Sequence, residues 1–164
     1  MLHSGMRLKC PGGMRRVEEL SPGDIVSTAD QGDQAIATIR SLSRSGADLP
    51  DALRPVRLDR WCFGAGFPKR DLTVSPAQRV SVKGARMEMM VGDGQSLVSA
   101  LDLVGQEGIR QLEREEVTYV RLTFAQPVLL LVHGWALEAA GEHRVSEEAA
   151  VEADLFFSRQ TVRC

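Results

Sequence analysis

Residues 15–28 read Arg15-Arg16-Val17-Glu18-Glu19-Leu20-Ser21-Pro22-Gly23-Asp24-Ile25-Val26-Ser27-Thr28, and this stretch decides the fold. It contains two short runs of alternating apolar residues, which are joined by Ser21-Pro22-Gly23-Asp24. Proline presets φ at the second position of a turn, and glycine supplies the positive φ that a type II turn requires at the third position. The stretch therefore predicts a corner between two β-strands.

Alternation of apolar and polar residues predicts β-strands along most of the chain. Gly12-Gly13 predicts a hairpin turn near the start, and residues 43–53 are predicted to form a loop because they are polar and lack a period. The apolar run Val128–Val132 is expected to pair with the strand before it across Ala125-Gln126-Pro127. The predicted strands are residues 6–10, 14–17, 25–28, 35–42, 55–63, 72–74, 79–82, 87–91, 115–124 and 128–132.

Two segments change to the helical period. Ser96 is a candidate N-cap for a short helix over residues 97–104, and a second, amphipathic helix is predicted over residues 146–158. The second helix is interpreted as a lid on the β core, although its apolar face suits a partner equally well. The predicted fold is all-β with one short internal helix and a C-terminal helix. Residues 1–141 would form the β domain, and residues 142–164 the helix and tail packed on it.

Composition argues against several functional classes. The 164 residues suit one domain, and a net charge of -2 with a pI near 5.9 offers no basic field for nucleic acid. The 3 cysteines form no CxxC pair, so neither a disulfide framework nor a cysteine zinc site is indicated. The N-terminus lacks the apolar core of a signal peptide, and no apolar run is long enough to cross a bilayer. We expect a cytoplasmic protein without a nucleic-acid or membrane partner; export without an N-terminal signal stays open.

Several side chains were considered for catalysis or metal binding: Cys10, Cys62, Cys164, His3, His133 and His143. The cysteines are interpreted as structural, except that the terminal one suits adventitious disulfide dimers. The histidines lack the spacing of a metal set and are interpreted as solvent or turn residues, so no metal and no cofactor is expected. Asp24 and Asp71 are expected to cap backbone N–H groups beside turns, and Trp61, Trp135 and Phe67 to lie in the core.

A second informative stretch is Asp71-Leu72-Thr73-Val74-Ser75-Pro76-Ala77-Gln78-Arg79-Val80. It contains the turn Ser75-Pro76-Ala77-Gln78, in which proline removes a backbone donor and serine can cap the turn. Together with the first stretch, it resembles the Hint domain, the fold shared by hedgehog autoprocessing domains and inteins. The resemblance is greatest to the bacterial branch of short modules. The matching pieces, in order, are Gly5 and residues 13–26, 55–58, 64–80, 117–119 and 134–138.

The resemblance implies a flattened, horseshoe-like all-β fold with two pseudo-symmetric halves. In the family, a cysteine at the first position attacks the peptide bond before it. This N-to-S acyl shift forms a thioester, which a later nucleophile resolves. A histidine in a Thr/Ser-x-x-His motif twists the scissile amide and protonates the departing nitrogen. The chemistry therefore needs the thiol, the histidine and a residue upstream of the cysteine.

The sequence departs from the family at each of these points. Counted back from Gly5, the family's cysteine position is Met1, which has no thiol and no preceding peptide bond. Gln78 stands where the family has histidine, in the same motif as Ser75, and glutamine can hydrogen-bond but cannot act as an acid. In the final hairpin, where this branch usually carries another histidine, the chain has Gln126-Pro127. These coincident losses predict that self-cleavage is absent.

Functional hypotheses of different classes follow. The preferred one is a Hint-like domain with a degenerate active site, retained as a structural or binding module. A shallow groove near Met1 and Gln78 would then take a protein or peptide. The alternative is an autoprocessing domain, of the self-cleaving or splicing type, whose nucleophile-bearing N-terminal flank is missing or altered. A third hypothesis, an unrelated small β-barrel, would lack the pseudo-symmetric halves.

Overall fold

The computed structural model describes residues 1–45, 49–82 and 96–142. These residues are mostly β-strand, so the all-β prediction is confirmed. The strands are β1 (Leu2–His3), β2 (Arg7–Cys10), β3 (Gly13–Arg16), β4 (Ile25–Ser27), β5 (Asp33–Ser45), β6 (Val56–Leu58), β7 (Leu72–Val74), β8 (Arg79–Val82), β9 (Ser96–Ser99), β10 (Ile109–Gln111), β11 (Glu116–Phe124), β12 (Val128–Val132) and β13 (Trp135–Gly141). Short 3-10 helices are η1 (Val17–Glu19), η2 (Asp51–Leu53) and η3 (Leu101–Leu103).

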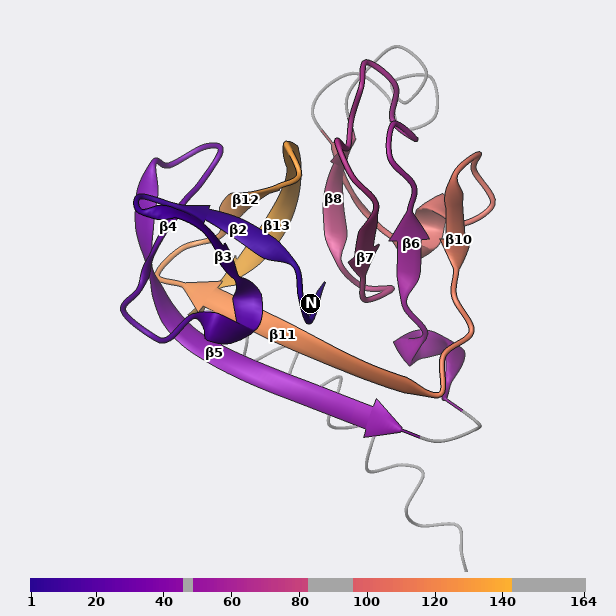
Figure 1. The fold of residues 1–164 in the computed structure, drawn as a ribbon, viewed down its shortest axis with the longest axis horizontal. Helices are drawn as coiled ribbons and strands as arrows, with labels where there is room; N and C mark the ends of the chain where they lie inside the picture. Colours follow the sequence, from indigo (N-terminus) through magenta and orange to yellow (C-terminus); the bar gives the residue numbers. More distant parts are fainter. Residues whose placement is uncertain (46–48, 83–95, 143–164) are drawn as a thin grey trace, which may run out of the picture.

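Within the described residues, most strands belong to one curled sheet. Its main path runs in the order β10-β6-β7-β1-β11-β13-β8-β9, with β5 paired to β11 and β4, and β12 paired to β13. Figure 1 shows β5 and β11 as a long pair along one edge of the molecule. Strands β2, β3, β4, β12 and β13 gather on one side above this pair, and β6, β7, β8 and β10 on the other. The N-terminus lies between the two sides, where β1 joins β7 to β11.

The corner forms where the sequence predicted it. Gly23 has φ 90, the positive value that the turn needs, and its N–H donates to the carbonyl of Ile36 at 2.8 Å. Asp24 Oδ2 accepts from the backbone N–H of Ser21 at 2.9 Å, which confirms its capping role. The predicted strand over residues 14–17 forms as β3, but η1 lies between this strand and the corner, and its Val17 is fully buried. The corner therefore joins a 3-10 turn to β4.

The predicted internal helix over residues 97–104 is wrong. Its first part is strand β9, which pairs with β8 in the register Val80↔Val98, and η3 follows. Apolar residues three and four apart satisfied the helical period, but β8 offers β9 a complete row of backbone partners. Tertiary pairing therefore overrides the local period. The predicted strand over residues 87–91 and the C-terminal helix over residues 146–158 lie outside the described residues.

The predicted pairing of Val128–Val132 with the preceding strand is also wrong. β12 pairs with β13, which is not among the predicted strands, across a turn at His133-Gly134. Both edges of β11 are already occupied, one by β5 and the other by β1 and β13. Because no edge of β11 remains, β12 finds its hydrogen bonds on the following strand.

The segment around Trp61 differs from its prediction as well. The strand predicted over residues 55–63 ends at Leu58, and Trp61 is 56% exposed where a core position was expected. The turn begins at Asp59, whose carbonyl accepts from Cys62 N at 3.1 Å. The loop predicted over residues 43–53 is shorter, because β5 continues to Ser45.

The core has two parts. A large cluster lies between the faces of the curled sheet and includes the side chains of Leu8, Val26, Leu58, Leu72 and Leu137. A small satellite cluster contains Leu49, Val117 and Tyr119, with Met1 and Leu53 packed against it. The first residue of the chain is thus partly buried and packs against the satellite cluster. No helix among the described residues is long and apolar enough to span a bilayer.

Candidate functional site

The structure brings together the residues that the sequence singled out at positions 1, 75 and 78. The backbone nitrogen of Met1 donates to Ser75 Oγ at 2.8 Å and to Gln78 Oε1 at 3.0 Å. The Met1 carbonyl in turn accepts from the backbone N–H of Ser75 at 3.0 Å. The first residue is therefore held on both sides of its backbone by one turn.

Strand pairing places this turn beside the chain start. Leu2 in β1 pairs with Val74 in β7, and Ser75 follows β7 directly. Gln78 directly precedes β8, and its backbone N–H closes the turn on the Ser75 carbonyl at 3.0 Å. The compact turn aims a hydroxyl and an amide oxygen at the same backbone nitrogen. The sequence predicted the turn, but only the β1–β7 pairing delivers Met1 to it.

The orientation of the Gln78 amide is set by its other partners. Its Nε2 donates to the carbonyl of Arg79 at 2.9 Å and to the carbonyl of Glu138 at 2.7 Å. Both amide hydrogens are used there, so the oxygen must face the Met1 nitrogen. Gln78 is 6% exposed and Ser75 2% exposed, so both acceptor side chains are buried, while Met1 is half-buried. At this position the side chain accepts a hydrogen bond from the nitrogen and has no proton to give it.

A second set of contacts supports the amide. Arg79 pairs with Glu138 at 3.3 Å, and its other guanidinium nitrogen donates to the carbonyl of Leu97 at 3.1 Å. These contacts tie β8 to both of its neighbours, β13 and β9. Neither Arg79 nor Glu138 has a role predicted from the sequence. The available signal was that Arg79 and Glu138 fall in two stretches that match the family pattern, residues 64–80 and 134–138.

Neither cysteine of the described residues is an activated nucleophile. Burial, more than any charge, raises the pKa of the Cys10 thiol, and Cys10 is buried in β2. Burial, together with the nearby Asp59 carboxylate, raises the pKa of Cys62 to about 11. A nucleophilic cysteine needs a lowered pKa, so both thiols are predominantly protonated near neutral pH. Cys164 lies outside the described residues.

The histidines of the described residues lie apart from each other. His3 Nδ1 is 2.8 Å from the Ser4 carbonyl, and its ring meets Tyr119 edge-on at 6.1 Å between centroids. His133 lies in the β12–β13 turn with φ 49, and burial, with the charge of Arg70, lowers its pKa. Within the described ranges, no three His, Cys, Asp or Glu side chains cluster as metal ligands would. Gln126 is exposed in the turn before β12.

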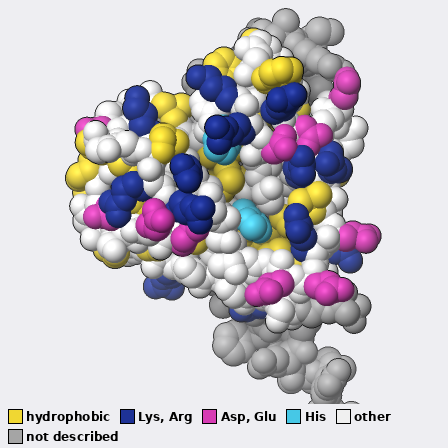
Figure 2. Space-filling model, viewed as in Figure 1, with side chains coloured by type: hydrophobic (Ala, Val, Ile, Leu, Met, Phe, Trp, Pro, Cys, Tyr) yellow, Lys and Arg dark blue, Asp and Glu magenta, His cyan; other side chains and the backbone are white. Residues whose placement is uncertain are grey.

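Figure 2 draws the side chains on the face of the molecule that is seen in Figure 1. Histidine and hydrophobic side chains are visible there between regions rich in Lys and Arg. Ser75 and Gln78 themselves are buried. A ligand on this face would therefore meet neighbouring side chains before it could meet Gln78.

The fold and this site define a class of protein. A curled all-β domain that holds the backbone nitrogen of its first residue against a turn between two central strands has the architecture of the hedgehog/intein fold. The chain belongs to the Hint domain family, because the family's sequence model matches residues 1–144. The sequence-based resemblance is thereby confirmed. No protein with a curated description matches the chain.

Solved structures support the same fold. The MchDnaB-1 intein is 13% identical, with a TM-score of 0.53 over 85% of this chain and 99% of the intein. Its N145AA variant gives a TM-score of 0.54 at 13% identity, over 86% of this chain and 100% of the variant. The Msm DnaB1 intein splicing domain, solved with bound zinc, is 12% identical with a TM-score of 0.51 over 85% and 99% of the two chains. At such low identity these likenesses establish the fold and nothing about activity.

Proposed function

We propose that this Hint domain does not cleave itself and serves as a structural or binding module. The observation that carries the proposal is the Gln78 amide. Its Nε2 is engaged by the carbonyls of Arg79 and Glu138, so only the oxygen faces the Met1 nitrogen. Departure of that nitrogen in an acyl shift requires a proton, and an amide oxygen cannot supply one. The site therefore retains the family's hydrogen bond to this nitrogen without its acid.

The side chain of Met1 supports the same proposal. It packs against the cluster of Leu49, Val117 and Tyr119, and it carries no nucleophile. The methionine side chain buries apolar surface here, and it buries more than the smaller cysteine side chain would. Met1 thus acts as a packing residue at the position where the family has its attacking group.

The alternative function is autoprocessing by a form of the domain with a different N-terminal flank. One observation favours it: the nitrogen of the family's scissile bond is still held by two oxygen acceptors, Ser75 Oγ and Gln78 Oε1. Positioning of a scissile amide is one component of the chemistry. The missing thiol and acid are the other components, and their absence favours the first proposal.

The test is intact mass of the full chain fused behind a short tag. Four fusions are compared: the unmodified chain, Met1→Cys, Met1→Cys with Gln78→His, and Met1→Ala with Gln78→His as the control without a nucleophile. Each is incubated with and without dithiothreitol. In a competent fusion, the thiolate attacks the tag's last carbonyl, the C–N bond breaks, and the histidine protonates the nitrogen. Dithiothreitol thiolate then attacks the thioester and releases the tag as its own thioester.

We expect the unmodified fusion and the alanine control to keep their mass, and the Cys/His double variant to release the tag. Release from the unmodified fusion would overturn the proposal. Thermal unfolding of each fusion is measured in parallel, because histidine at position 78 must replace an amide with two carbonyl partners. A folded double variant that stays intact would show that the thiol and the imidazole alone are not sufficient for cleavage on this scaffold.

The finer sequence-based hypotheses remain proposals as well. They are the bacterial short-module branch, the cytoplasmic location, the pseudo-symmetry of the two halves, and the division at residues 141 and 142. A protein or peptide partner in the groove near Met1 belongs with them.

A further inference from the structure

The loop between β6 and β7, residues 59–71, exposes a large aromatic side chain. Trp61 is 56% exposed, more than any other large hydrophobic side chain of the described residues. Its φ of 66 lies in the left-handed region, which bulky residues rarely adopt and which costs about 1–3 kcal/mol. The surrounding structure therefore holds an indole in water in a conformation that its backbone disfavours.

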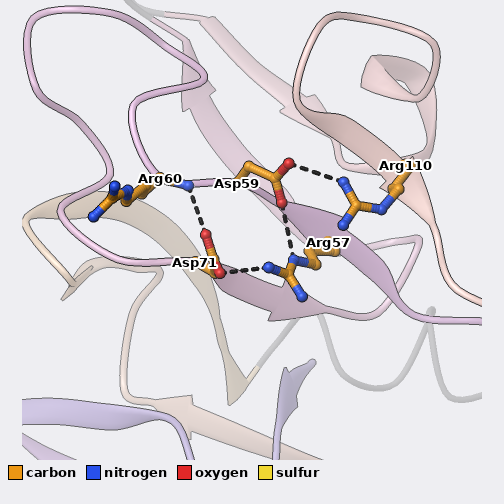
Figure 3. Close-up of polar contacts among 5 residues, drawn as sticks. All are labelled: Arg57, Asp59, Arg60, Asp71 and Arg110. Atoms are coloured by element: carbon orange, nitrogen blue, oxygen red, sulfur yellow. Dashed lines mark hydrogen bonds and ion pairs between the residues drawn. The ribbon is translucent and has the colours of Figure 1, made fainter.

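A charge network ties the two ends of this loop together (Figure 3). Arg57 donates from Nε to Asp59 Oδ1 at 2.9 Å and from Nη2 to Asp71 Oδ2 at 2.5 Å. Arg110, from β10, donates to Asp59 Oδ2 at 2.8 Å, and the backbone N–H of Arg60 donates to Asp71 Oδ1 at 2.8 Å. The loop is thus closed at its base beside the exposed indole.

Backbone bonds and aromatic packing order the rest of the loop. Trp61 N donates to the Pro68 carbonyl at 2.9 Å, and Phe63 N donates to the Phe67 carbonyl at 3.2 Å. The ring of Phe63 stacks on Trp135 of β13 with 4.5 Å between centroids. A loop that is already ordered loses little conformational entropy when it binds a partner.

The loop also presents unneutralised positive charge. Its two carboxylates are occupied by the arginines of the network. Arg60, Lys69 and Arg70 are exposed, and none of them has a carboxylate partner among the described residues. The Arg60 guanidinium lies 4.5 Å from the centroid of the Trp61 ring, as in a cation–π contact. Cations and an indole therefore share one surface.

We propose that the loop 59–71 is a docking site for an acidic peptide segment of a partner protein. A hydrophobic side chain of the segment packs on Trp61, and its carboxylates pair with Arg60, Lys69 and Arg70. Trp and Arg are the side chains that dominate protein interfaces, and a guanidinium holds a carboxylate through two parallel bonds. Nucleic acid fits less well, because the chain carries a net charge of -2. The proposal goes beyond the proposed function and does not depend on the loss of self-cleavage.

The test is a titration of the ¹⁵N-labelled full chain with a short synthetic peptide of glutamates around one phenylalanine. The chain has 2 tryptophans, so Trp61 and Trp135 supply one indole resonance each. Trp61 lies at the proposed surface, whereas the indole nitrogen of Trp135 is buried. We expect a saturable shift of the Trp61 resonance, a much smaller shift of the Trp135 resonance, and weaker binding at higher salt. Trp61→Phe assigns the two signals.

Affinity is then measured by anisotropy of the labelled peptide. We expect Trp61→Gly and Arg60→Gln each to weaken binding about tenfold. Glycine adopts the left-handed backbone without strain, so the first variant keeps the fold. Arg40→Gln, which removes an exposed cation from β5, serves as the matched control and should leave the affinity unchanged.

Several results would overturn the proposal. The first is that the Trp61 resonance does not shift at millimolar peptide. The second is that a peptide with lysines in place of the glutamates binds with the same affinity, and the third is that oligothymidine binds more tightly than the acidic peptide. Unchanged affinity in both loop variants would also overturn it. If removal of residues 143–164, which include Glu147, Glu148, Glu152 and Asp154, strengthened peptide binding, the occupant would be this chain's own acidic segment, not a partner. None of these results bears on the cleavage assay, so the two proposals fail separately.

Discussion

Substitution of Gln78 by methionine tests the energetic role of the candidate site. Methionine keeps the approximate volume of the side chain but removes its three hydrogen bonds, to the Met1 nitrogen and to the carbonyls of Arg79 and Glu138. Each such bond contributes about 0.5–1.5 kcal/mol net, and a buried polar group that loses its partner adds a desolvation cost. Because Gln78 is 6% exposed, water cannot replace the lost partners without entering the fold. We expect the free energy of unfolding to fall by about 2–4 kcal/mol.

The assay is urea unfolding at equilibrium, followed by tryptophan fluorescence. The midpoint should fall while the m value stays constant, because the native surface area is unchanged. Gln31→Met is the matched control. Gln31 is exposed, and its side-chain Nε2 donates to the Pro127 carbonyl at 3.0 Å, so the loss of this side-chain bond should cost no more than about 0.5 kcal/mol.

Equal losses for the two variants would refute the reasoning. The Gln78 contacts would then contribute nothing beyond a surface hydrogen bond, and the side chain would not fix the Met1 nitrogen. A fall in the m value would instead indicate a changed denatured or native state. Gln78→Ala, which also opens a cavity, should cost more than Gln78→Met.

Three further predictions concern the β12–β13 turn and the loop that packs on it. Gly134→Ala should lower the free energy of unfolding by about 2–4 kcal/mol, because φ is 79 and the added Cβ would lie 2.8 Å from Phe67 Cε1. Denaturant midpoints check this, and a neutral result would contradict the packing there. Trp135→Ala should lower the free energy of unfolding by about 3–5 kcal/mol, because it removes the ring that stacks on Phe63. Trp135→Phe should lower it by less than about 1 kcal/mol, because phenylalanine keeps the ring stack and removes a buried indole N–H that has no hydrogen-bond partner. Burial raises the pKa of Cys62 to about 11, so the folded state retains the thiol proton longer than the unfolded chain, whose pKa is about 8.5. Stability should therefore fall as the pH rises between these values, and a pH series of unfolding midpoints should show a smaller fall in Cys62→Ala.

Local structure followed closely from the sequence at the turns. The Ser21-Pro22-Gly23-Asp24 corner and the Ser75-Pro76-Ala77-Gln78 turn form where they were predicted, and Gly23 has the positive φ expected of it. The first hairpin is displaced by one residue, because Cys10 pairs with Gly13 across Pro11-Gly12. Turns depend on the φ preferences and side-chain caps of a few consecutive residues, and these are readable in one stretch of chain.

The errors share a different cause. The apolar period of residues 97–104 predicted a helix, but their first part pairs with β8 as strand β9. The closeness of β12 to β11 in the sequence predicted a hairpin, but β12 pairs with β13. Trp61 was expected in the core because the chain has few aromatic residues, but its side chain is exposed. The strand before it ends at the network formed by Arg57, Asp59 and Asp71. Each outcome depends on which strand edge or surface is free once the rest of the chain has folded.

The candidate site divides in the same way. By itself, the sequence determined the family resemblance, the turn that carries Ser75 and Gln78, and the absence of a thiol and an imidazole at the two expected positions. Only the tertiary structure decided that Met1 reaches this turn, because the β1–β7 pairing joins residues more than seventy positions apart. It also decided that the Gln78 amide presents its oxygen, since the two carbonyls that hold its nitrogen belong to β8 and β13. Hydrogen-bond direction in a buried amide is set by all of its neighbours together, and those neighbours come from strands that are distant in the sequence.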